Sequence, residues 1–448
     1  MSLAVLVAGL GFGDEGKGQT TDFLCRRYGA KCVVRHNGGA QAAHNVCLTD
    51  GRHHTFSQFG SGTFVPGVKT YLSQHMLVNP IAALAEGAHL ERLGIKDCFE
   101  RVFVDDCALV TTPYHVAANR IREMARDKSG GRHGSCGMGI GETMGDYLSL
   151  LKKGHGTVIR IFDLFPDNTF RAKLNYIRID KLQELEKMHF EGCPFSTGEC
   201  SCPFAKEWDI LQDPSTVDLC IEKFMEFKAK VHLVAPNHEK TIVSGGTIIF
   251  EGAQGVLLDQ DYGFHPYTTW TDITFRNAFE ILERAGHTGD IKRIGVLRTY
   301  LTRHGAGPFP TEDKSLDHPE LHNGNGPWQQ GFRQGHFDLC LARYALKAIG
   351  GVDELSMTHV DRVQGTQKMC VSYDYQGHTM SEFDAETMWE VRENLATREQ
   401  MTRVFGQFEP MYQTLNYTSE GFASEISKLL GVKIGMWAHG PTSEDRRV

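Results

Sequence analysis

A glycine-rich stretch near the N-terminus carries the residues best suited to chemistry. It reads Gly11-Phe12-Gly13-Asp14-Glu15-Gly16-Lys17-Gly18 and follows an apolar run over residues 3–8. A strand that leads through such a turn into a helix directs backbone N–H groups and the positive end of the helix dipole at an anion. The spacing is that of a phosphate-binding loop, with Lys17 placed to neutralise phosphate oxygens. We therefore predict that the loop binds nucleotide phosphates through Gly13, Glu15, Gly16, Lys17 and Gly18.

Two features of this loop depart from an ordinary phosphate loop. Gly18 stands where a serine or threonine usually ligates Mg²⁺, and Asp14 and Glu15 place carboxylates beside the phosphates that they would repel. A carboxylate at this position is explained if it holds a metal ion or moves a proton. The alternative is a structural glycine-rich turn with solvated acids, but the agreement of strand, loop and lysine favours the phosphate site.

Two later glycine-rich segments resemble the first in composition. Residues 37–45 include Gln41 and end at His44, a side chain whose charge changes near neutral pH, so His44 is a candidate for acid–base catalysis although a lone histidine is often structural. Residues 130–141 contain Ser135 and Cys136 and lead into a helical pattern. We expect this segment to grip phosphate, with a flexible linker as the alternative.

Polar residues also follow later apolar runs. Gln254 lies in a small-residue turn predicted after a strand over residues 247–250, where α/β proteins bind ligands. Asp361 ends another apolar run, over residues 355–361. A carboxylate at this place can accept two N–H bonds from the edge of a guanine, although a single aspartate is weak evidence.

Length and composition limit the class of protein. The chain has 448 residues, of which 41% are hydrophobic and 23% charged, as in a globular protein with a large core. The net charge of -8 argues against a nucleic-acid partner. Because we find no long apolar span and no signal peptide, we expect no membrane partner and a cytoplasmic location. Twelve cysteines in so long a chain indicate reduced thiols.

Alternating apolar runs and helical patterns predict an α/β fold with a large, mostly parallel central sheet flanked by helices. Strands are expected over residues 3–8, 31–35, 70–72, 101–104, 247–250, 293–298, 355–361 and 432–437. Helices are expected over residues 80–93, 144–151, 171–187, 216–230 and 337–348. Residues 302–312 are predicted to form a rigid loop. We expect one elaborated domain over residues 1–448.

A cysteine-containing segment interrupts the helical region. Cys193, Cys200 and Cys202 lie within residues 189–206, which we predict to be a surface insertion. Three cysteines with His189 offer zinc ligands, but their spacing is not that of a standard zinc knuckle, so a metal site there is the alternative.

Taken together, these motifs resemble the adenylosuccinate synthetase family. The resemblance is carried in order by residues 13–18, 33–35 with His44, 250–255 and 305–312, and it extends from Leu3 to Pro441. It implies the family's own α/β fold and a homodimer. It also implies a ligase that uses GTP and Mg²⁺ to join L-aspartate to C6 of the purine nucleotide IMP, through a 6-phosphoryl intermediate.

The resemblance further implies roles for single residues. Asp14 would be the catalytic base and, with Ala43, a ligand of Mg²⁺. Lys17 would hold phosphates, and His44 would assist phosphoryl transfer to the 6-oxygen. The resemblance also places Gln254 among the catalytic residues. The residues expected to bind the nucleotides are Gly13, Glu15, Gly16, Gly18, Gln41, Ser135, Cys136, Thr269, His359, Asp361, Gly440 and Pro441.

The chain departs from the family most clearly where the amino acid binds. The family grips two carboxylates with clustered arginines, because guanidinium groups match carboxylates in shape and charge. Here residues 327–338 keep a single arginine, Arg333, and Met138 replaces another. The amino substrate is therefore predicted to meet Arg333, Arg303 and Thr311, with weak affinity for aspartate.

Three interpretations stay open. The first is an enzyme that couples IMP to aspartate. The second is a paralogue that uses another amine or a guanine nucleotide, as a 2-aminoadenylosuccinate synthetase does. The third is a purine-nucleotide-binding protein without catalysis. Asp14, Lys17 and His44 favour an enzyme, because a binding protein has little use for an acid in its phosphate loop.

Overall fold

A ten-stranded sheet runs through the middle of the structure, a computed structural model that describes residues 2–128, 131–188, 203–235, 238–320, 322–324, 328, 331–363 and 365–448. In spatial order its strands are β20 (Arg446–Arg447), β19 (Ile434–Ala438), β15 (Glu354–Thr358), β11 (Asp290–Arg298), β1 (Leu3–Gly9), β10 (Thr247–Gly255), β2 (Cys32–Arg35), β5 (Lys69–Leu72), β7 (Val102–Asp105) and β9 (His232–Val234). Neighbouring strands pair in parallel, except β19 with β20. The predicted fold class, a mostly parallel sheet, is confirmed.

Strand β1 shows why the N-terminal sequence is almost continuously apolar. Successive side chains of a strand point to opposite faces of the sheet. Ala4, Leu6 and Ala8 therefore enter the larger hydrophobic core on one face, whereas Val5 and Val7 join a smaller core on the other. Since both faces are buried, the strand needs apolar residues at every position, as is typical of a parallel sheet.

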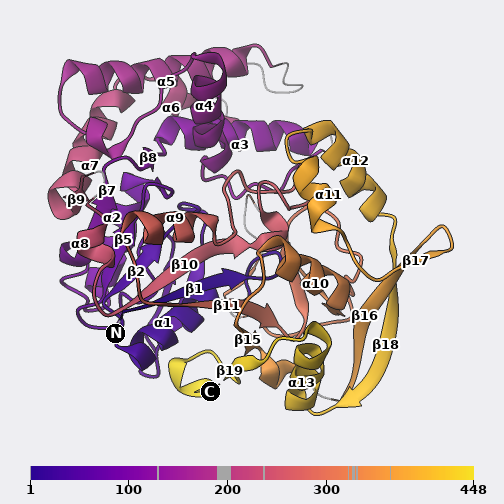
Figure 1. The fold of residues 1–448 in the computed structure, drawn as a ribbon. Coiled ribbons are helices and arrows are strands. Elements are labelled where there is room, and N and C mark those ends of the chain that lie inside the picture. The colour runs from indigo at the N-terminus through magenta and orange to yellow at the C-terminus, as the bar shows by residue number, and fades with distance from the viewer. Residues whose placement is uncertain are drawn as a thin grey trace.

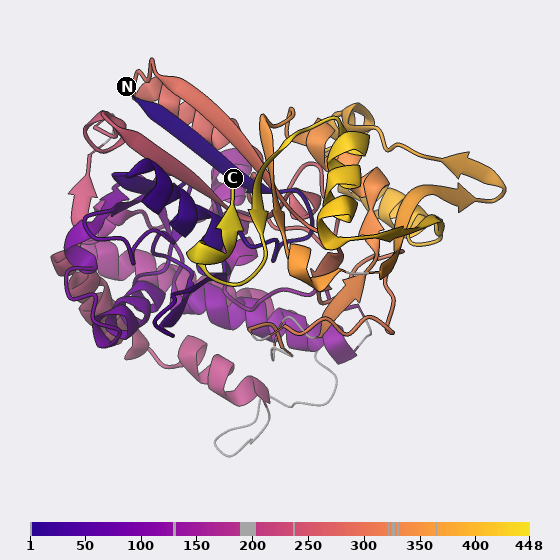
Figure 2. The same cartoon turned by 90° about the horizontal axis from the view of Figure 1, so that it is seen from below.

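Thirteen helices surround this sheet in the described ranges (Figure 1). They are α1 (Lys17–Tyr28), α2 (Pro80–Arg92), α3 (Pro113–Lys128), α4 (Ile140–Lys153), α5 (Asn168–Glu186), α6 (Pro203–Gln212), α7 (Thr216–Lys230), α8 (Lys240–Val243), α9 (Arg276–Arg284), α10 (Leu339–Ala348), α11 (Ala385–Glu390), α12 (Leu395–Phe405) and α13 (Ser419–Leu430). Figure 2 shows the indigo-to-magenta N-terminal part and the orange-to-yellow C-terminal part on opposite sides of the long central strands.

Smaller sheets complete the fold. The C-terminal part contains β14 (Phe337–Asp338), β16 (Gly365–Tyr375), β17 (His378–Met380) and β18 (Glu409–Tyr417) in one sheet. Three two-stranded sheets join β3 (His44–Cys47) to β4 (His53–Phe56), β6 (Leu77–Val78) to β8 (Leu109–Val110), and β12 (Leu301–His304) to β13 (Phe332–Gly335). The β3–β4 hairpin and the β12–β13 pair both carry residues that matter for the site.

The carboxyl ends of the parallel strands lie at one edge of the sheet. The chain segments that leave β1, β2, β10, β11, β15 and β19 therefore meet there, although they are far apart in the sequence. Ligands of open α/β sheets bind at this edge. This arrangement gathers the predicted glycine-rich segments around one place.

Most predicted elements are confirmed, and the differences lie at the site. Residues 251–255, predicted as a turn, continue β10 to Gly255. The strand predicted over residues 355–361 ends at Thr358, so Asp361 lies in a short 3₁₀ helix, Val360–Arg362. The loop predicted over residues 302–312 begins with β12, because Leu301–His304 finds a partner strand 28 residues or more further along the chain.

Two further predictions concern the cysteine-containing segment and the absence of membrane-spanning helices. Cys193, Cys200 and Cys202, with most of the segment 189–206, lie outside the described residues, and α6 begins at Pro203. Within the described ranges, every helix lacks the length or the hydrophobicity that crossing a bilayer would require.

Candidate functional site

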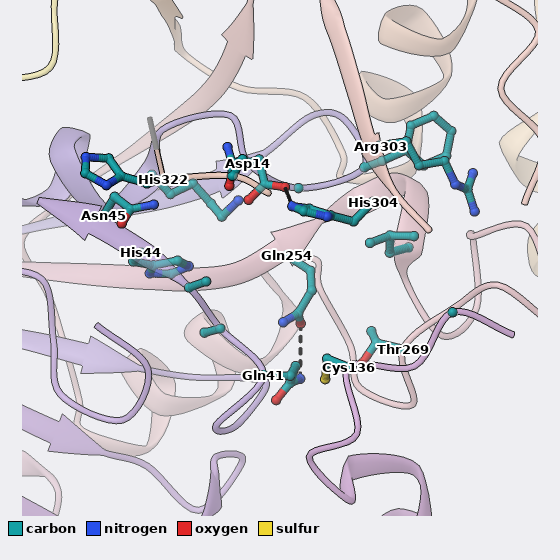
Figure 3. A pocket seen from close by; sticks show the side chains of 18 of the residues that line it. Asp14, Gln41, His44, Asn45, Cys136, Gln254, Thr269, Arg303, His304 and His322 are labelled. Atoms are coloured by element: carbon teal, nitrogen blue, oxygen red, sulfur yellow. Dashed lines mark hydrogen bonds and ion pairs between the residues drawn. The ribbon is translucent and has the colours of Figure 1, made fainter. Parts of the chain in front are cut away.

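A cavity of about 790 Å³ opens at the carboxyl edge of the sheet and brings the predicted segments together (Figure 3). The predicted site residues that line it are Gly13, Asp14, Gly16, Lys17, Gly18, Gln41, Ala43, His44, Ser135, Cys136, Gln254, Thr269, Arg303, His359, Asp361, Gly440 and Pro441. Glu15, Thr311 and Arg333 are not among the lining residues of the described chain. Their positions are described below.

The first glycine-rich segment forms a tight loop that ends at the N-terminus of α1. Gly13, Asp14 and Gly16 have positive φ angles of 95°, 61° and 94°, and Gly16 is the residue that caps α1. Left-handed residues favour glycine, so Asp14 holds a costly conformation. The loop thus presents the helix N-terminus and Lys17 to the cavity, as a phosphate site requires.

Glu15 lies beneath the loop. It is 3% exposed, and its carboxylate accepts hydrogen bonds from the Gly11 and Gly13 N–H groups at 3.0 and 2.8 Å. It also contacts the Lys17 Nζ at 2.5 Å. Glu15 thus shapes the loop and holds the lysine, and the sequence did not distinguish this role from direct contact with a nucleotide.

Asp14 projects into the cavity from this loop. Its carboxylate lies 3.4 Å from Nε2 of His304, and its backbone carbonyl accepts a hydrogen bond from Nε of Arg298 at 2.5 Å (Figure 3). Arg298 is itself buried and paired with Glu320. The unusual backbone of Asp14 is therefore fixed by a buried cation on β11, and the carboxylate stays available to a ligand.

His44 begins β3 and is held by a buried glutamate. Its Nδ1 lies 2.7 Å from Oε1 of Glu251, which is fully buried on β10 and also accepts the Ser61 N–H at 3.0 Å. Burial by itself would raise the pKa of Glu251, but His44, Arg35 and Ser61 hold it at about 2. The carboxylate is therefore ionised at neutral pH.

The ring of His44 is placed as a proton carrier. Burial lowers the pKa of His44, while Glu251 opposes that change. Because Nδ1–H donates to the ionised carboxylate, Nε2 is the nitrogen left for a ligand, and it has no hydrogen-bond partner among the described residues. Glu251 was not predicted as a site residue, since its only signal in the sequence is an acid at the end of an apolar strand.

Two glutamines face each other beside this histidine. Nε2 of Gln41 donates to Oε1 of Gln254 at 3.3 Å, and Gln254 has a φ of 49° (Figure 3). Of the four non-glycine residues with positive φ in the described chain, Asp14, Gln254 and His359 line the cavity. Strained backbone collects at functional sites, so this distribution itself marks the cavity.

The third glycine-rich segment approaches the cavity through the start of α4. Gly139 caps that helix with a φ of 77°, and Ile140 and Gly141 line the cavity. Asn119 braces the turn by accepting from Ser135 Oγ at 2.9 Å and Gly139 N–H at 3.2 Å. Burial raises the pKa of Cys136 to about 11, so its thiol is neutral at pH 7.

The segments after β15 and β19 form another wall of the cavity. Thr358 at the end of β15 donates to the Glu15 carbonyl at 2.7 Å, which ties this strand to the phosphate loop. His359 is left-handed, and Asp361 pairs with Arg362 at 3.1 Å while remaining 31% exposed. Gly440 and Pro441 line the same cavity. His359, Asp361, Gly440 and Pro441, all predicted to bind nucleotide, therefore line one cavity.

The two arginines predicted for the amino substrate are engaged by the protein itself. Arg333 holds the carboxylate of Glu312 at 2.6 and 3.0 Å and donates to the Gly305 and Gly307 carbonyls, each at 3.0 Å. It faces Arg303 across the β12–β13 pair. Like charges directly opposite each other are unfavourable, and Glu312 offsets them.

Arg303 is almost fully buried at the edge of the cavity. It donates to the Ala306 and Pro308 carbonyls at 3.1 and 2.9 Å and lies 4.2 Å above the ring of Phe12. Burial and the nearby Arg333 lower its pKa to about 9. Thr311 is fully buried below the same loop.

Comparison with known sequences places this geometry in a family. The sequence pattern of the family described as adenylosuccinate synthetase matches residues 6–447. The chain belongs to the adenylosuccinate synthetase family. Among its relatives, the adenylosuccinate synthetase of Gloeobacter violaceus is 32% identical over 92% of this chain and 84% of its own length. That of Saccharopolyspora erythraea is 29% identical over 98% of this chain and 97% of its own.

Solved structures of adenylosuccinate synthetase relatives share the fold. The enzyme from Plasmodium falciparum has a TM-score of 0.73 and 20% identity, with 99% of this chain and 98% of the other covered. Cyanophage S-2L succinoaminodeoxyadenylate synthetase, bound to dGMP and to dATP as an energy donor, has a TM-score of 0.54 and 14% identity over 100% and 95% of the chains. At these identities the likeness concerns the fold.

Adenylosuccinate synthetases are ligases that use GTP and Mg²⁺, and the cavity offers oxygen ligands for the ion. Mg²⁺ takes few protein oxygens and keeps water and phosphate oxygens as its other ligands. The Asp14 carboxylate, 20% exposed in the cavity, and the exposed Ala43 backbone supply oxygens of this kind beside the phosphate loop. The residues present therefore fit the ion that the family uses.

Proposed function

We propose that this protein is a GTP- and Mg²⁺-dependent ligase that forms a C6–N bond on a 6-oxopurine nucleotide, with IMP as the first candidate. The observation that carries the proposal is the meeting, in one cavity, of a phosphate loop containing Asp14 and of His44 oriented by Glu251. A site that only binds nucleotides has no use for an acid in its phosphate loop. Nor does it need a buried histidine–carboxylate pair with a free nitrogen in the cavity.

The chemistry follows from the poor leaving ability of a 6-oxo group. Removal of the N1 proton by Asp14 makes the 6-oxygen a nucleophile toward the γ-phosphorus of GTP, and the bond from that phosphorus to GDP breaks. The 6-oxygen is then part of a phosphate. An amine attacks C6, and inorganic phosphate leaves with the electron pair of the C–O bond.

The other residues position and stabilise this transfer. Lys17 and the N-terminus of α1 neutralise the transferred phosphoryl group. When this anionic group approaches Nε2 of His44, the protonated ring becomes favourable, and His44 then donates to the oxygens between purine and phosphorus. Mg²⁺, held by Asp14 and the Ala43 carbonyl, would supply positive charge to the phosphates. Gln41 and Gln254 can pair with the base or its phosphate through their amides.

GTP is proposed as the donor because of Asp361. A carboxylate pairs with guanine N1–H and the 2-amino group, and adenine has neither donor at those places. Asp361 lies beside Gly440 and Pro441 at the cavity wall joined to the phosphate loop through Thr358. By its family the ligase is also proposed to act as a homodimer.

The amine has two candidates. L-aspartate is the first, from the family. A less acidic amino acid or small amine is the second, and it is favoured by one observation: Arg333 and Arg303 already bind Glu312 and four backbone carbonyls of the chain. Guanidinium groups that are engaged inside the protein grip the two carboxylates of a substrate poorly.

One experiment tests the function and identifies the amine. The protein is incubated with GTP, Mg²⁺, a panel of 6-oxopurine nucleotides (IMP, GMP and their deoxy forms) and a panel of amino acids, and GDP, phosphate and product masses are measured. We expect GDP, phosphate and a coupled product in equal amounts. The Asp14→Asn variant is the matched control. GTP turnover that no nucleotide stimulates, without any coupled product, would overturn the proposal.

A further inference from the structure

Outside the proposed reaction, the β3–β4 hairpin carries an unassigned group of metal-binding side chains. Cys47 and His53 are directly opposite each other in the hairpin. Directly opposed residues of an antiparallel pair project from the same face with their Cβ atoms about 4.5–5.5 Å apart. The hairpin therefore fixes a thiol and an imidazole next to each other through its register alone.

A third ligand comes from a distant segment. The ring of His322 stacks on that of His53, with 3.8 Å between centroids and 7° between planes, and its Nε2 lies 3.6 Å from Sγ of Cys47. One ligand atom from each of Cys47, His53 and His322 lies within 4.8 Å of the other two. The three residues are 275 positions apart at the widest, so the fold brings them together.

The spacing is that of ligands around a tetrahedral ion. With Zn–S of about 2.3 Å and Zn–N of about 2.0–2.1 Å, sulfur and nitrogen ligands of one zinc ion lie about 3.5 Å apart. The Cys47–His322 separation of 3.6 Å matches this value, whereas the stacked rings of His53 and His322 need one ring to turn before both direct a nitrogen at the same ion. One thiolate and two imidazoles favour Zn²⁺ over Mg²⁺, which prefers oxygen.

A neighbouring amide already orients one of the ligands. Oδ1 of Asn45 lies 2.8 Å from Nε2 of His53 and also accepts from the Thr55 hydroxyl at 2.7 Å. Since an amide oxygen is an acceptor, His53 donates through Nε2, and its Nδ1 is left for a metal. Histidine ligands of metals are commonly held in this way through their other nitrogen. Asn45 and His322 can be followed in Figure 3, at the end of the view opposite Arg303.

We propose that Cys47, His53 and His322 bind a zinc ion at the edge of the nucleotide cavity. Three protein ligands leave the fourth position of a tetrahedral ion to water or to an incoming ligand. Because Cys47 and His322 line the cavity, an oxygen of a bound phosphate can take that position. The ion also links the β3–β4 hairpin to the segment that contains His322.

Metal binding by the full chain tests the proposal without any measurement of ligase activity. Protein freed of metal by a chelator is titrated with Co²⁺, whose absorption reports thiolate ligation and tetrahedral geometry, and with Zn²⁺ in competition with a coloured chelator. We expect one equivalent of zinc with a dissociation constant below about 1 μM, and a thiolate-to-cobalt band. A wild-type protein that binds zinc no tighter than about 10 μM would overturn the proposal.

Substitutions distinguish zinc binding at Cys47, His53 and His322 from zinc binding elsewhere in the chain. Cys47→Ser should remove the cobalt band, His322→Ala should weaken zinc binding at least tenfold, and Asn45→Ala should weaken it 10- to 100-fold. His322 lies outside the helices and strands, so its loss should leave the fold intact, as circular dichroism can check. Cys107→Ser and Asp14→Asn are the matched controls and should bind zinc like the wild type. A cobalt band that survives in Cys47→Ser, for instance through Cys193, Cys200 and Cys202, would contradict the assignment.

Discussion

The phosphate loop and the β12–β13 pair use acidic side chains in different ways. Around the phosphate loop, Glu15 and Glu251 are buried beneath Lys17 and His44 and turn these cationic and proton-carrying groups toward the cavity. On the β12–β13 pair, Glu312 holds Arg333 within the protein. The buried acids near the phosphate loop thus hold Lys17 and His44 in place, whereas Glu312 engages Arg333, the cation that was predicted to meet the amino substrate.

Under the proposed function, this difference separates two requirements of the reaction, phosphoryl transfer and recognition of the amine. Phosphoryl transfer needs preorganised charge, because its catalysis consists largely of positioning and electrostatic stabilisation. Recognition of the amine needs only enough contacts to distinguish one substrate from another, so it can change without loss of the reaction.

The largest effect is expected at Asp14. Asp14→Asn keeps the size of the side chain but removes its charge and its ability to accept the N1 proton. Turnover should fall by about 10²-fold or more, while nucleotide affinity stays within about tenfold, because general base catalysis contributes about 10²–10⁴-fold. Steady-state kinetics with binding measured by calorimetry separate the two quantities. Turnover close to that of the wild type would show that Asp14 is not the base.

Glu251 should matter for both stability and turnover. A pKa of about 2 in the folded protein, against about 4.3 when unfolded, corresponds to about 3 kcal/mol of stability. Because the folded pKa is depressed, this stabilisation is complete above about pH 4.3 and is lost as the pH falls toward 2. Denaturant unfolding of Glu251→Gln and the wild type should therefore differ by about 3 kcal/mol at pH 7, and by about half of that near pH 3.

The control for Glu251 is an acid of the same type at the surface. Glu280 is 45% exposed, and Glu280→Gln should change stability by less than about 0.5 kcal/mol. In Glu251→Gln, turnover should also decrease, since His44 loses the carboxylate that fixes its tautomer. An equal difference between variant and wild type at pH 7 and pH 3 would contradict the ionised state assigned to Glu251.

Site residues could be predicted from the sequence where they lie close together along the chain. The phosphate loop and the start of α1 lie within 16 residues of β1, so their order alone predicts a strand, a turn and a helix N-terminus. Asp14 and Lys17 were predicted as site residues in this way, and His44 was predicted from the second glycine-rich segment. By contrast, the Glu251–His44 contact joins residues 207 positions apart, and no pattern along the chain announces it.

The sequence also could not show which groups of the protein the predicted arginines bind. Arg333 was predicted from the sequence to meet the amino substrate, but its pairing with Glu312 depends on the register of β12 and β13, which places Arg303 opposite Arg333. Strand register depends on pairing between segments that are far apart in the chain. The same limit hid the Cys47–His53–His322 group, although each residue was visible in the sequence.

A moderate effect is expected when the phosphoryl donor carries adenine in place of guanine. Leaving a hydrogen-bonding acceptor unpaired costs about 1–3 kcal/mol, so GTP should be used at least about tenfold better than ATP, as judged by kcat/KM. In Asp361→Ala, this preference should disappear while the rate with ATP changes little. Arg362→Ala serves as control, because it removes the neighbour of Asp361 but not the carboxylate. Equal use of ATP and GTP by the wild type would refute the assignment.

The smallest effect is expected for the charge of the amine. A site that pairs an unengaged arginine with the side-chain carboxylate of aspartate should gain about 1.5–3 kcal/mol over asparagine, which is more than a tenfold preference. Here both guanidinium groups are occupied by Glu312 and by carbonyls of residues 305–308. The ratio of kcat/KM for aspartate over asparagine should therefore stay within about threefold.

Comparing aspartate with asparagine also shows whether Arg333 holds the loop in place or binds the substrate carboxylate. If Arg333 holds the loop in place, Arg333→Ala should raise the KM of both amines at least about tenfold and by similar factors, with GTP affinity unchanged. If it reads the substrate carboxylate, only the KM of aspartate should rise. Glu312→Gln releases Arg333 and should increase the preference for aspartate, since the guanidinium group then becomes available. A low-micromolar KM for aspartate in the wild type would show that the altered loop still recognises a dicarboxylate.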